Sequence, residues 1–267
     1  MPEGHTLHRL AGELTEAFGG HTISSGSPQG RFAGASALDG RLLDHAEAWG
    51  KHLFVDFGDV AEQVHIHLGL YGSFRIAAGV PEVIGQVRWR VSDGTTTADL
   101  RGPTACELLT PAEVETILDR LGPDPLRDDA DAGAFIARVL RSRAAIATLL
   151  MDQSVIAGVG NVYRAEVLFR HGIDPFTPGR ELPVPVLEAI WADLVLLMRE
   201  GVRTGRIDTV RPEHEPEAMG RPPRQDDHGG EVYVYRRDGQ PCWICGEPVL
   251  TRVVGARNLF WCPGCQP

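Results

Sequence analysis

The chain has 267 residues, 43% of them hydrophobic, which predicts a globular protein of one large or two medium domains. No apolar run approaches the ~18 residues of a membrane span, and the opening lacks a signal-peptide stretch, so we expect a soluble cytoplasmic protein. The formal net charge of −10 argues against a nucleic-acid ligand, because phosphate binding needs a positively charged face.

The first half of the chain has the pattern of a β-rich domain behind one helix. A helix is predicted over 7–18, with Leu7, Leu10, Leu14 and Phe18 on one face. Alternating or β-branched segments bounded by glycine and aspartate predict strands over 52–57, 62–68, 72–78 and 87–94. We therefore expect a β-sandwich domain over residues 1–124. The following residues, 125–133, are rich in Pro, Asp and Gly and predict a linker.

The second half has helical periodicity before strands return, so the fold class is α+β. Helices are predicted over 134–142, 144–152, 161–172 and 183–201, a polar loop over 203–230, and strands over 231–237 and 248–255. This gives a helical domain over 134–230 and a small terminal module over 231–267. The range 138–170 is locally basic despite the acidic total. It holds Arg138, Arg141, Arg143, Arg164 and Arg170 against Asp152 and Glu166.

Four of the five cysteines form two Cys-x-x-Cys pairs, separated by sixteen residues, near the end of the chain. This spacing is typical of one tetrahedral Zn²⁺ bound by four thiolates. Disulfides are the alternative, but they need an oxidising compartment that nothing else in the sequence indicates. We predict one structural zinc ion bound by Cys242, Cys245, Cys262 and Cys265.

Lys51 is the single lysine among 26 basic residues. A compact ammonium can give up its proton, which a guanidinium does poorly, so a retained lysine suggests a functional site. A leftover surface lysine is an equally good alternative on composition alone.

The segment 151–175 contains a glycine turn that leads into a helix. Gly158 and Gly160 allow the turn, and Asn161 is expected in the capping position of the next helix. A helix start offers free backbone N–H groups and a positive dipole end, which suit a phosphate. An ordinary helical hairpin is the alternative, and spacing alone favours it.

These segments resemble the formamidopyrimidine-DNA glycosylase and endonuclease VIII family. The segment 151–175 is similar to its helix-two-turn-helix, and the segment 241–266 is similar to its C-terminal zinc finger. The resemblance implies that Asn161 and Arg257 bind the phosphates that flank a damaged nucleotide. The finger here reads Ala256-Arg257 where the family has Gly-Arg.

The Pro2-Glu3 opening also resembles that family. Removal of Met1 would expose the secondary amine of Pro2, which can attack a sugar C1′ and form an iminium, while Glu3 can transfer protons. The resemblance further implies that Lys51 contacts phosphate and assists β-elimination, and that Arg257 takes part in δ-elimination. Many members carry a second carboxylate in this opening, but here the chain reads Gly4-His5, so that role is not carried over.

The segment 67–72 is similar to the endonuclease VIII branch of the family. The resemblance implies that Leu70 and Tyr71 fill the gap left by an extruded nucleotide, and that Arg120 contacts DNA. A buried strand end is the alternative for Leu70 and Tyr71. Gly69 stands where that branch can carry glutamine, so one polar contact is missing.

The sequence therefore predicts a bifunctional DNA glycosylase and abasic-site lyase of base excision repair, with damaged DNA between the two domains. Its expected substrates are oxidised pyrimidines, released through a Schiff base on Pro2 and followed by β,δ-elimination. The alternatives are a glycosylase for oxidised purines and formamidopyrimidines, a glycosylase whose imine forms on Lys51, and a non-catalytic zinc protein that binds damaged DNA. The resemblance implies a monomer associated with a bacterial nucleoid.

Overall fold

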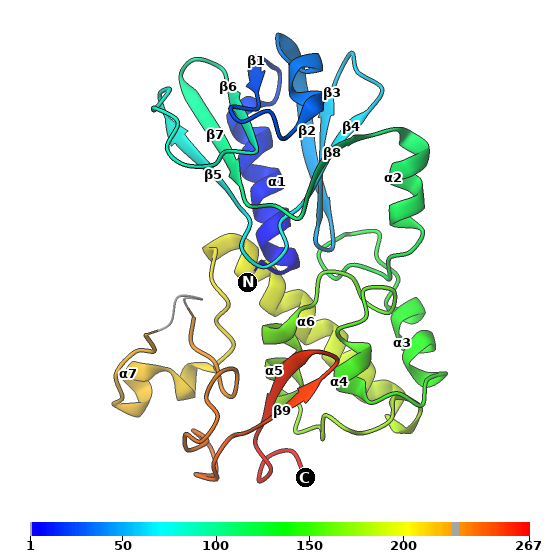
Figure 1. Cartoon of the computed structure of the whole chain (residues 1–267). Helices are drawn as coiled ribbons and strands as arrows, with labels where there is room; N and C mark the ends of the chain where they lie inside the picture. Colours follow the sequence, from blue (N-terminus) through cyan, green and yellow to red (C-terminus); the bar gives the residue numbers. More distant parts are fainter. Residues whose placement is uncertain (1, 226–229) are drawn as a thin grey trace. The chain divides into compact units, whose positions relative to one another are not determined.

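The computed structural model describes residues 2–225 and 230–267 of the chain. The chain divides into two compact units, Met1–Arg120 and Leu121–Pro267, and each has its own hydrophobic core. The first unit is mostly β-sheet and the second mostly helical (Figure 1). No helix among the described residues is long and apolar enough to cross a membrane.

The first unit is an antiparallel β-sandwich with a helix at its start, as the sequence predicts. Its strands pair in the order β5-β7-β6-β1-β2-β3-β4-β8. They are β1 (His21–Gly26), β2 (Arg41–Trp49), β3 (His52–Phe57), β4 (Gln63–His67), β5 (Ser73–Ala78), β6 (Trp89–Ser92), β7 (Thr96–Arg101) and β8 (Ala105–Leu109). Strand β1 joins the two halves, because residues 21–23 pair with β2 and residues 24–26 pair with β6.

Helix α1 (Gly4–Phe18) lies against β2 and β3 (Figure 1). Its apolar side chains recur at helical spacing and are almost fully buried: Leu7, Leu10, Leu14 and Phe18. They pack in the same core as Leu53 and Ile66 from the sheet. Burial of this stripe fixes the helix on the sheet, and the helix begins three residues before the predicted start. The unit also contains η1 (Ala33–Ala37) and ends in α2 (Pro111–Leu118).

The second unit is built around α5 (Asn161–Arg170), in which every residue from Asn161 to Phe169 is buried. A helix that is buried on all sides needs partners all round. The other elements are α3 (Ala132–Leu140), α4 (Ile146–Leu149), η2 (Gly179–Glu181), α6 (Val184–Thr204), η3 (Pro212–His214), α7 (Pro216–Met219), β9 (Leu250–Val254) and β10 (Arg257–Trp261). Helices α4 and α6 and strand β10 contact α5.

The segment 231–237 is not a strand, so that prediction is wrong. Its backbone N–H groups instead converge on the buried carboxylate of Glu166: those of Tyr233, Val234 and Tyr235 donate to it at 2.7, 2.9 and 2.8 Å. Because these donors are used by a side chain, they cannot form a β-ladder. The predicted loop over 203–230 contains η3 and α7, and its residues 226–229 lie outside the described residues.

The stretch predicted as a linker, 125–133, is held to the second unit rather than free. Leu126 N–H donates to the buried Asp124 carboxylate at 2.9 Å, and Asp131 caps α3 by accepting from Gly133 N–H at 2.8 Å. Residues 132 and 133 are the first residues of α3. Capping and turn hydrogen bonds thus order a segment whose composition suggests flexibility.

Candidate catalytic and DNA-binding site

Pro2 and Glu3 directly precede the first turn of α1. Glu3 is the N-cap residue, with φ −118° and ψ 179°, and its carbonyl accepts from Thr6 N–H at 2.9 Å. The Glu3 side chain is fully buried, whereas Pro2 is partly exposed. A buried carboxyl next to a proline is the arrangement that proton transfer beside an amine nucleophile needs once Met1 is removed.

Hydrogen bonds between α1 and β2 fix which end of the sheet the helix start reaches. Ala46 N–H donates to Thr15 Oγ1 at 2.8 Å, and Gly20 N–H donates to Leu43 O at 2.8 Å, so helix and strand run in opposite directions. From Thr15 back to the helix start is roughly 16 Å at 1.5 Å per residue. From Ala46 forward to Gly50 is roughly 14 Å at strand rise. The helix start therefore lies at the level of the β2–β3 turn.

Lys51 lies in that turn. Trp49 pairs with His52, which leaves Gly50 and Lys51 as a two-residue loop. Gly50 has φ +59°, a conformation that glycine adopts without steric cost. The tight loop places Lys51 near the start of α1, so the structure brings Pro2, Glu3 and Lys51 to one end of the first unit.

Leu70 and Tyr71 lie in the turn that follows β4. Gly72 N–H donates to Leu68 O at 3.0 Å and closes the turn, and Leu70 and Tyr71 are 39% and 89% exposed. They are not a buried strand end, and two large apolar side chains exposed side by side suit contact with a partner. At Gly69, φ is +66° and a Cβ would lie 2.5 Å from Thr104 Cγ2, so a side chain at this position would be strained in this turn.

Asn161 is the first residue of α5, and Gly160 is the N-cap, so the predicted capping role of Asn161 is wrong. The Asn161 side chain is 5% exposed, and its Nδ2 donates to Asn258 O in β10 at 2.9 Å. The Arg164 guanidinium donates to Asn161 Oδ1 from the next turn of the helix. Because Asn258 follows Arg257, the structure brings the two predicted phosphate-binding residues together within the second unit.

Arg257 begins β10 directly after a two-residue loop. Val254 pairs with Arg257, and the intervening Gly255 and Ala256 have φ +57° and +60°. Hairpin turns of this kind need positive φ at both central positions, which is easy for glycine and strained for alanine. Ala256 therefore preserves the turn geometry of the family's Gly-Arg pair at a conformational cost.

The four predicted metal ligands lie together beside this hairpin. The thiol groups of Cys242, Cys245, Cys262 and Cys265 all lie within 4.8 Å of one another. The Cys242–Cys265 and Cys245–Cys262 sulfur pairs are 3.8 and 3.3 Å apart, too far for a disulfide bond. Zn–S bonds of about 2.3 Å place tetrahedral sulfurs about 3.8 Å apart, so the cluster fits a zinc ion.

Arg120 is the last residue of the first unit, two residues past the end of α2, and its side chain is exposed. Its contact with DNA remains a prediction from the sequence.

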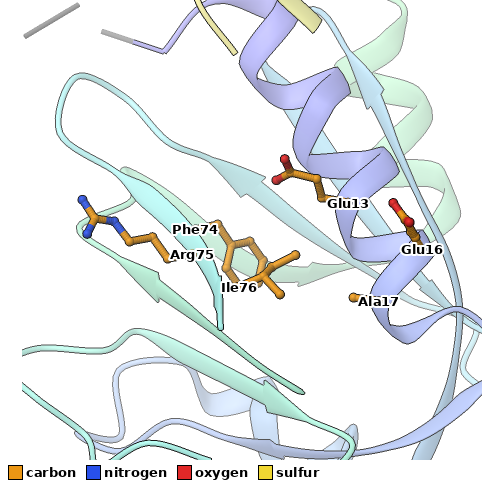
Figure 2. A pocket seen from close by; sticks show the side chains of 6 residues that line it. All are labelled: Glu13, Glu16, Ala17, Phe74, Arg75 and Ile76. Carbon is orange, nitrogen blue, oxygen red and sulfur yellow. The ribbon is translucent and has the colours of Figure 1, made fainter. Parts of the chain in front are cut away.

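A pocket elsewhere in the first unit is a poor candidate for the reaction. It lies between the last turns of α1 and β5, where Glu13, Glu16 and Ala17 face Phe74, Arg75 and Ile76 (Figure 2). The distance along α1 from its first residue, Gly4, to Glu13 is roughly 14 Å at helical rise. The pocket contains none of the predicted catalytic residues.

Family models match most of the chain. The N-terminal domain of formamidopyrimidine-DNA glycosylase matches residues 1–106, and the H2TH domain of the same enzyme matches residues 121–212. Endonuclease 8 1 of Mycobacterium tuberculosis is 52% identical over all of both chains, and Escherichia coli endonuclease 8 is 29% identical, also over all of both chains. The chain belongs to the formamidopyrimidine-DNA glycosylase and endonuclease VIII family.

Solved structures of this family share the fold. The Lactococcus lactis Fpg, in a complex with DNA containing an abasic site, superposes with a TM-score of 0.80 at 21% identity over 99% of both chains. Thermus thermophilus MutM superposes with a TM-score of 0.77 at 27% identity over 99% of this chain and 98% of that chain. As a member of the endonuclease VIII and Fpg family, the protein is a DNA glycosylase and abasic-site lyase of base excision repair.

The sequence analysis does not identify a cluster of three histidines near Lys51. His52, His65 and His67 lie close together on one face of the sheet, and His52 directly follows the Lys51 turn. The His52 ring stacks on the His65 ring and is tilted by 60° to the His67 ring. Alternation within the 62–68 strand was enough to place His65 and His67 on one face. Nothing in the sequence indicates that His52 joins them, because that contact depends on strand register.

Proposed function

We propose that this enzyme excises oxidised pyrimidines through a Schiff base on Pro2 and then cleaves the strand by β,δ-elimination. The observation that carries the proposal is that Pro2, Glu3 and Lys51 lie at one end of the first unit. The 52% identity to a mycobacterial endonuclease 8 and the exposed Leu70–Tyr71 pair favour pyrimidine lesions over purines.

The chemistry begins with Pro2 after Met1 has been removed. The amine attacks C1′ of the extruded nucleotide, the bond from C1′ to the base breaks, and the base leaves with a proton. Glu3, buried beside the amine, protonates the ring oxygen so that the sugar opens to an iminium. Loss of a C2′ proton expels the 3′ phosphate, and a second elimination expels the 5′ phosphate. Water then hydrolyses the remaining iminium and frees Pro2.

We infer distinct roles for the remaining residues. Lys51 binds phosphate and assists the first elimination, and Arg257 assists the second. Asn161 and Arg257 bind the phosphates beside the lesion, which their proximity through Asn258 supports. Leu70 and Tyr71 fill the gap in the duplex, and Arg120 makes a further DNA contact.

We also infer that the bound metal is zinc, since four thiolates at tetrahedral spacing are its preferred ligands. The ion would hold the β9–β10 hairpin that carries Arg257. The protein would act as a monomer on the DNA of the bacterial nucleoid, because one chain contains every residue that the proposal uses.

Borohydride trapping with three oligonucleotides, containing an oxidised pyrimidine, 8-oxoguanine or an abasic site, tests this proposal. We expect a cross-link on the Pro2 peptide with the oxidised pyrimidine and with the abasic site. Glu3→Gln is expected to lose excision while Glu16→Gln, on the exposed side of the same helix, keeps it. Trapping on Lys51 would replace the nucleophile, preference for 8-oxoguanine would replace the substrate, and no cross-link on any DNA would reject the Schiff-base mechanism.

A further inference from the structure

Three imidazoles lie close together on the face of the sheet that points away from α1. His52 lies on β3, and His65 and His67 lie on β4; His52 pairs directly with His67 across the strands. The His52 ring lies 5.1 Å from the His65 ring and 5.2 Å from the His67 ring, between centroids. Their strand neighbours Leu53 and Ile66 point into the core that α1 covers, so the histidines point to the opposite face.

A hydrogen-bonded chain runs from His52 to β8. His52 Nδ1 lies 2.9 Å from His65 Nε2, and His65 Nδ1 lies 3.1 Å from Glu107 Oε1. A carboxylate only accepts, so His65 Nδ1 donates its hydrogen to Glu107 and His65 Nε2 accepts from His52 Nδ1. This order requires neutral imidazoles, and burial lowers the pKa of both His52 and His65. The chain therefore fixes one tautomer and one ring orientation for each histidine.

His67 is held in a second arrangement, on the turn that carries Leu70. Its Nδ1 accepts from Gly69 N–H at 3.2 Å, and Thr104 Oγ1 lies 2.8 Å from the same nitrogen. Thr104 also binds the His67 backbone, since its N–H donates to His67 O at 2.8 Å. His67 thus ties the Leu68–Gly72 turn to the end of β4.

The two turns meet at this cluster. Lys51 immediately precedes His52, and the Leu70–Tyr71 turn immediately follows His67, while His65 contacts His52 and lies two residues from His67 on the same face. His65 is 4% exposed and lies in neither turn. A change at His65 would therefore reach Lys51 through His52, without removing a side chain from either turn.

We propose that His52, His65 and Glu107 are positioning residues that hold the Lys51 turn in fixed register with the Leu70–Tyr71 turn. This proposal rests on the roles proposed above for Lys51 and for Leu70 and Tyr71. Its consequence is that the lysine meets the sugar–phosphate only when the gap-filling residues are in place. Displacement of a reacting group by about 1 Å can cost on the order of a hundredfold in rate, so such positioning has a measurable effect.

The test uses His65→Leu in the full-length zinc-loaded enzyme, with single-turnover β-elimination at a preformed abasic site as the readout. We expect the rate at saturating enzyme to fall on the order of tenfold, with little change in the enzyme concentration that gives half-maximal rate. His65→Gln keeps an acceptor near the His52 N–H and is expected to recover most of the rate. His21→Leu, at an exposed histidine on β1, is the matched control and should leave the rate unchanged.

A double-mutant cycle with Lys51→Gln separates positioning from general damage to the fold. If His65 acts through Lys51, His65→Leu should change the rate less than about twofold in the Lys51→Gln background. A full tenfold loss in that background would overturn the proposal. An unchanged rate in Lys51→Gln alone would instead reject the role proposed for Lys51, which is a different outcome.

A second readout tests the link between the two turns. 2-Aminopurine placed opposite or beside the lesion reports insertion of Leu70 and Tyr71, and we expect His65→Leu to slow this fluorescence change together with elimination. If elimination slows while insertion is unaffected, the coupling is wrong. If His65→Leu fails to fold, Glu107→Leu carries the same test from the exposed end of the chain, with Glu107→Gln as the variant that keeps the acceptor.

Discussion

Buried neutral histidines make the first unit sensitive to acid. Burial is the largest cause that lowers the pKa of His5 to about 4 and of His52 to about 3, from 6.5. The unfolded chain therefore binds more protons than the folded chain below pH 6.5, and stability falls as pH falls towards these values. Between its folded and unfolded pKa values, each such histidine lowers the free energy of unfolding by about 1.4 kcal/mol for each unit that the pH falls.

The free energy of unfolding falls in both chains as the pH is lowered from 7.5 to 5. We expect this fall to be about 2 kcal/mol smaller in His52→Leu than in the unaltered chain, because the variant lacks one titrating group. Urea unfolding at the two pH values measures this difference. Comparison at both pH values also cancels the acid sensitivity of the cysteine cluster, which the two chains share. An identical loss in both chains would show that His52 does not stay neutral in the folded state.

Glu166 is a second buried residue that contributes to the stability of the fold. Besides three backbone N–H groups, its carboxylate accepts from Thr209 Oγ1 at 2.6 Å. Glu166→Gln replaces one accepting oxygen with an N–H₂ group that faces other donors, so we expect a loss of about 3 kcal/mol in urea unfolding. Glu188→Gln, on the exposed side of α6, is the control and should change stability by less than about 0.5 kcal/mol. Equal effects of the two substitutions would contradict this account of Glu166.

The residues that we expect to take part in the chemistry could be predicted from the sequence, whereas the buried residues that support the fold around them could not. Type and spacing alone pointed to the four cysteines, whereas the roles predicted for Pro2 and Lys51 depended on the resemblance to the family. Glu166 and His65 resemble surface residues in sequence, because burial and hydrogen bonds distinguish them only after folding. His65 binds Glu107, 42 residues away along the chain, and Glu166 binds Thr209, 43 residues away.

Elements formed by local signals could be predicted, and those set by distant partners could not. The helix α1 and strands β3 to β6 follow hydrophobic periodicity. The missed helix α2 also had a local signal: Thr110 and Glu113 form a capping box, with Pro111 at the first position. The segment 231–237 has strand-like alternation, but Glu166 takes its backbone donors, and nothing in its own sequence indicates this.

We expect the metal to affect DNA binding through the β9–β10 hairpin, which carries Arg257. Among the described residues, strands β9 and β10 pair only with each other, and a two-stranded hairpin is marginally stable alone. Removal of the metal with a thiol reagent and chelator should release one zinc ion per chain. It should also weaken binding to abasic-site DNA at least tenfold, because Arg257 loses its fixed position.

Two comparisons check this result. Cys262→Ser should lose the metal and the affinity together, whereas Cys106→Ser, in the core of the first unit, should keep both. Unchanged affinity in a chain shown by metal analysis to contain no zinc would mean that packing of β10 on α5 is enough to hold the hairpin.

For the whole molecule, a net charge of −10 has to be reconciled with a polyanionic substrate. Screening limits the reach of exposed charges to about 8 Å at physiological salt, so a few cations at the interface decide phosphate binding. The acidic faces repel DNA wherever they come close to it, which disfavours binding in other orientations. Many arginines are already paired with carboxylates, as Arg199 is with Asp128 at 3.1 Å, and these do not need phosphate partners.

This argument predicts how binding depends on salt. Each cation that neutralises a phosphate contributes about 0.9 to the slope of log K against log salt concentration. Lys51→Gln and Arg257→Gln should each reduce the slope by about that amount, whereas Arg199→Gln should leave it unchanged. Equal reductions in all three variants would mean that DNA responds to the summed charge of the protein. The excess of acidic residues would then oppose binding everywhere, and local arginine clusters could not explain recognition.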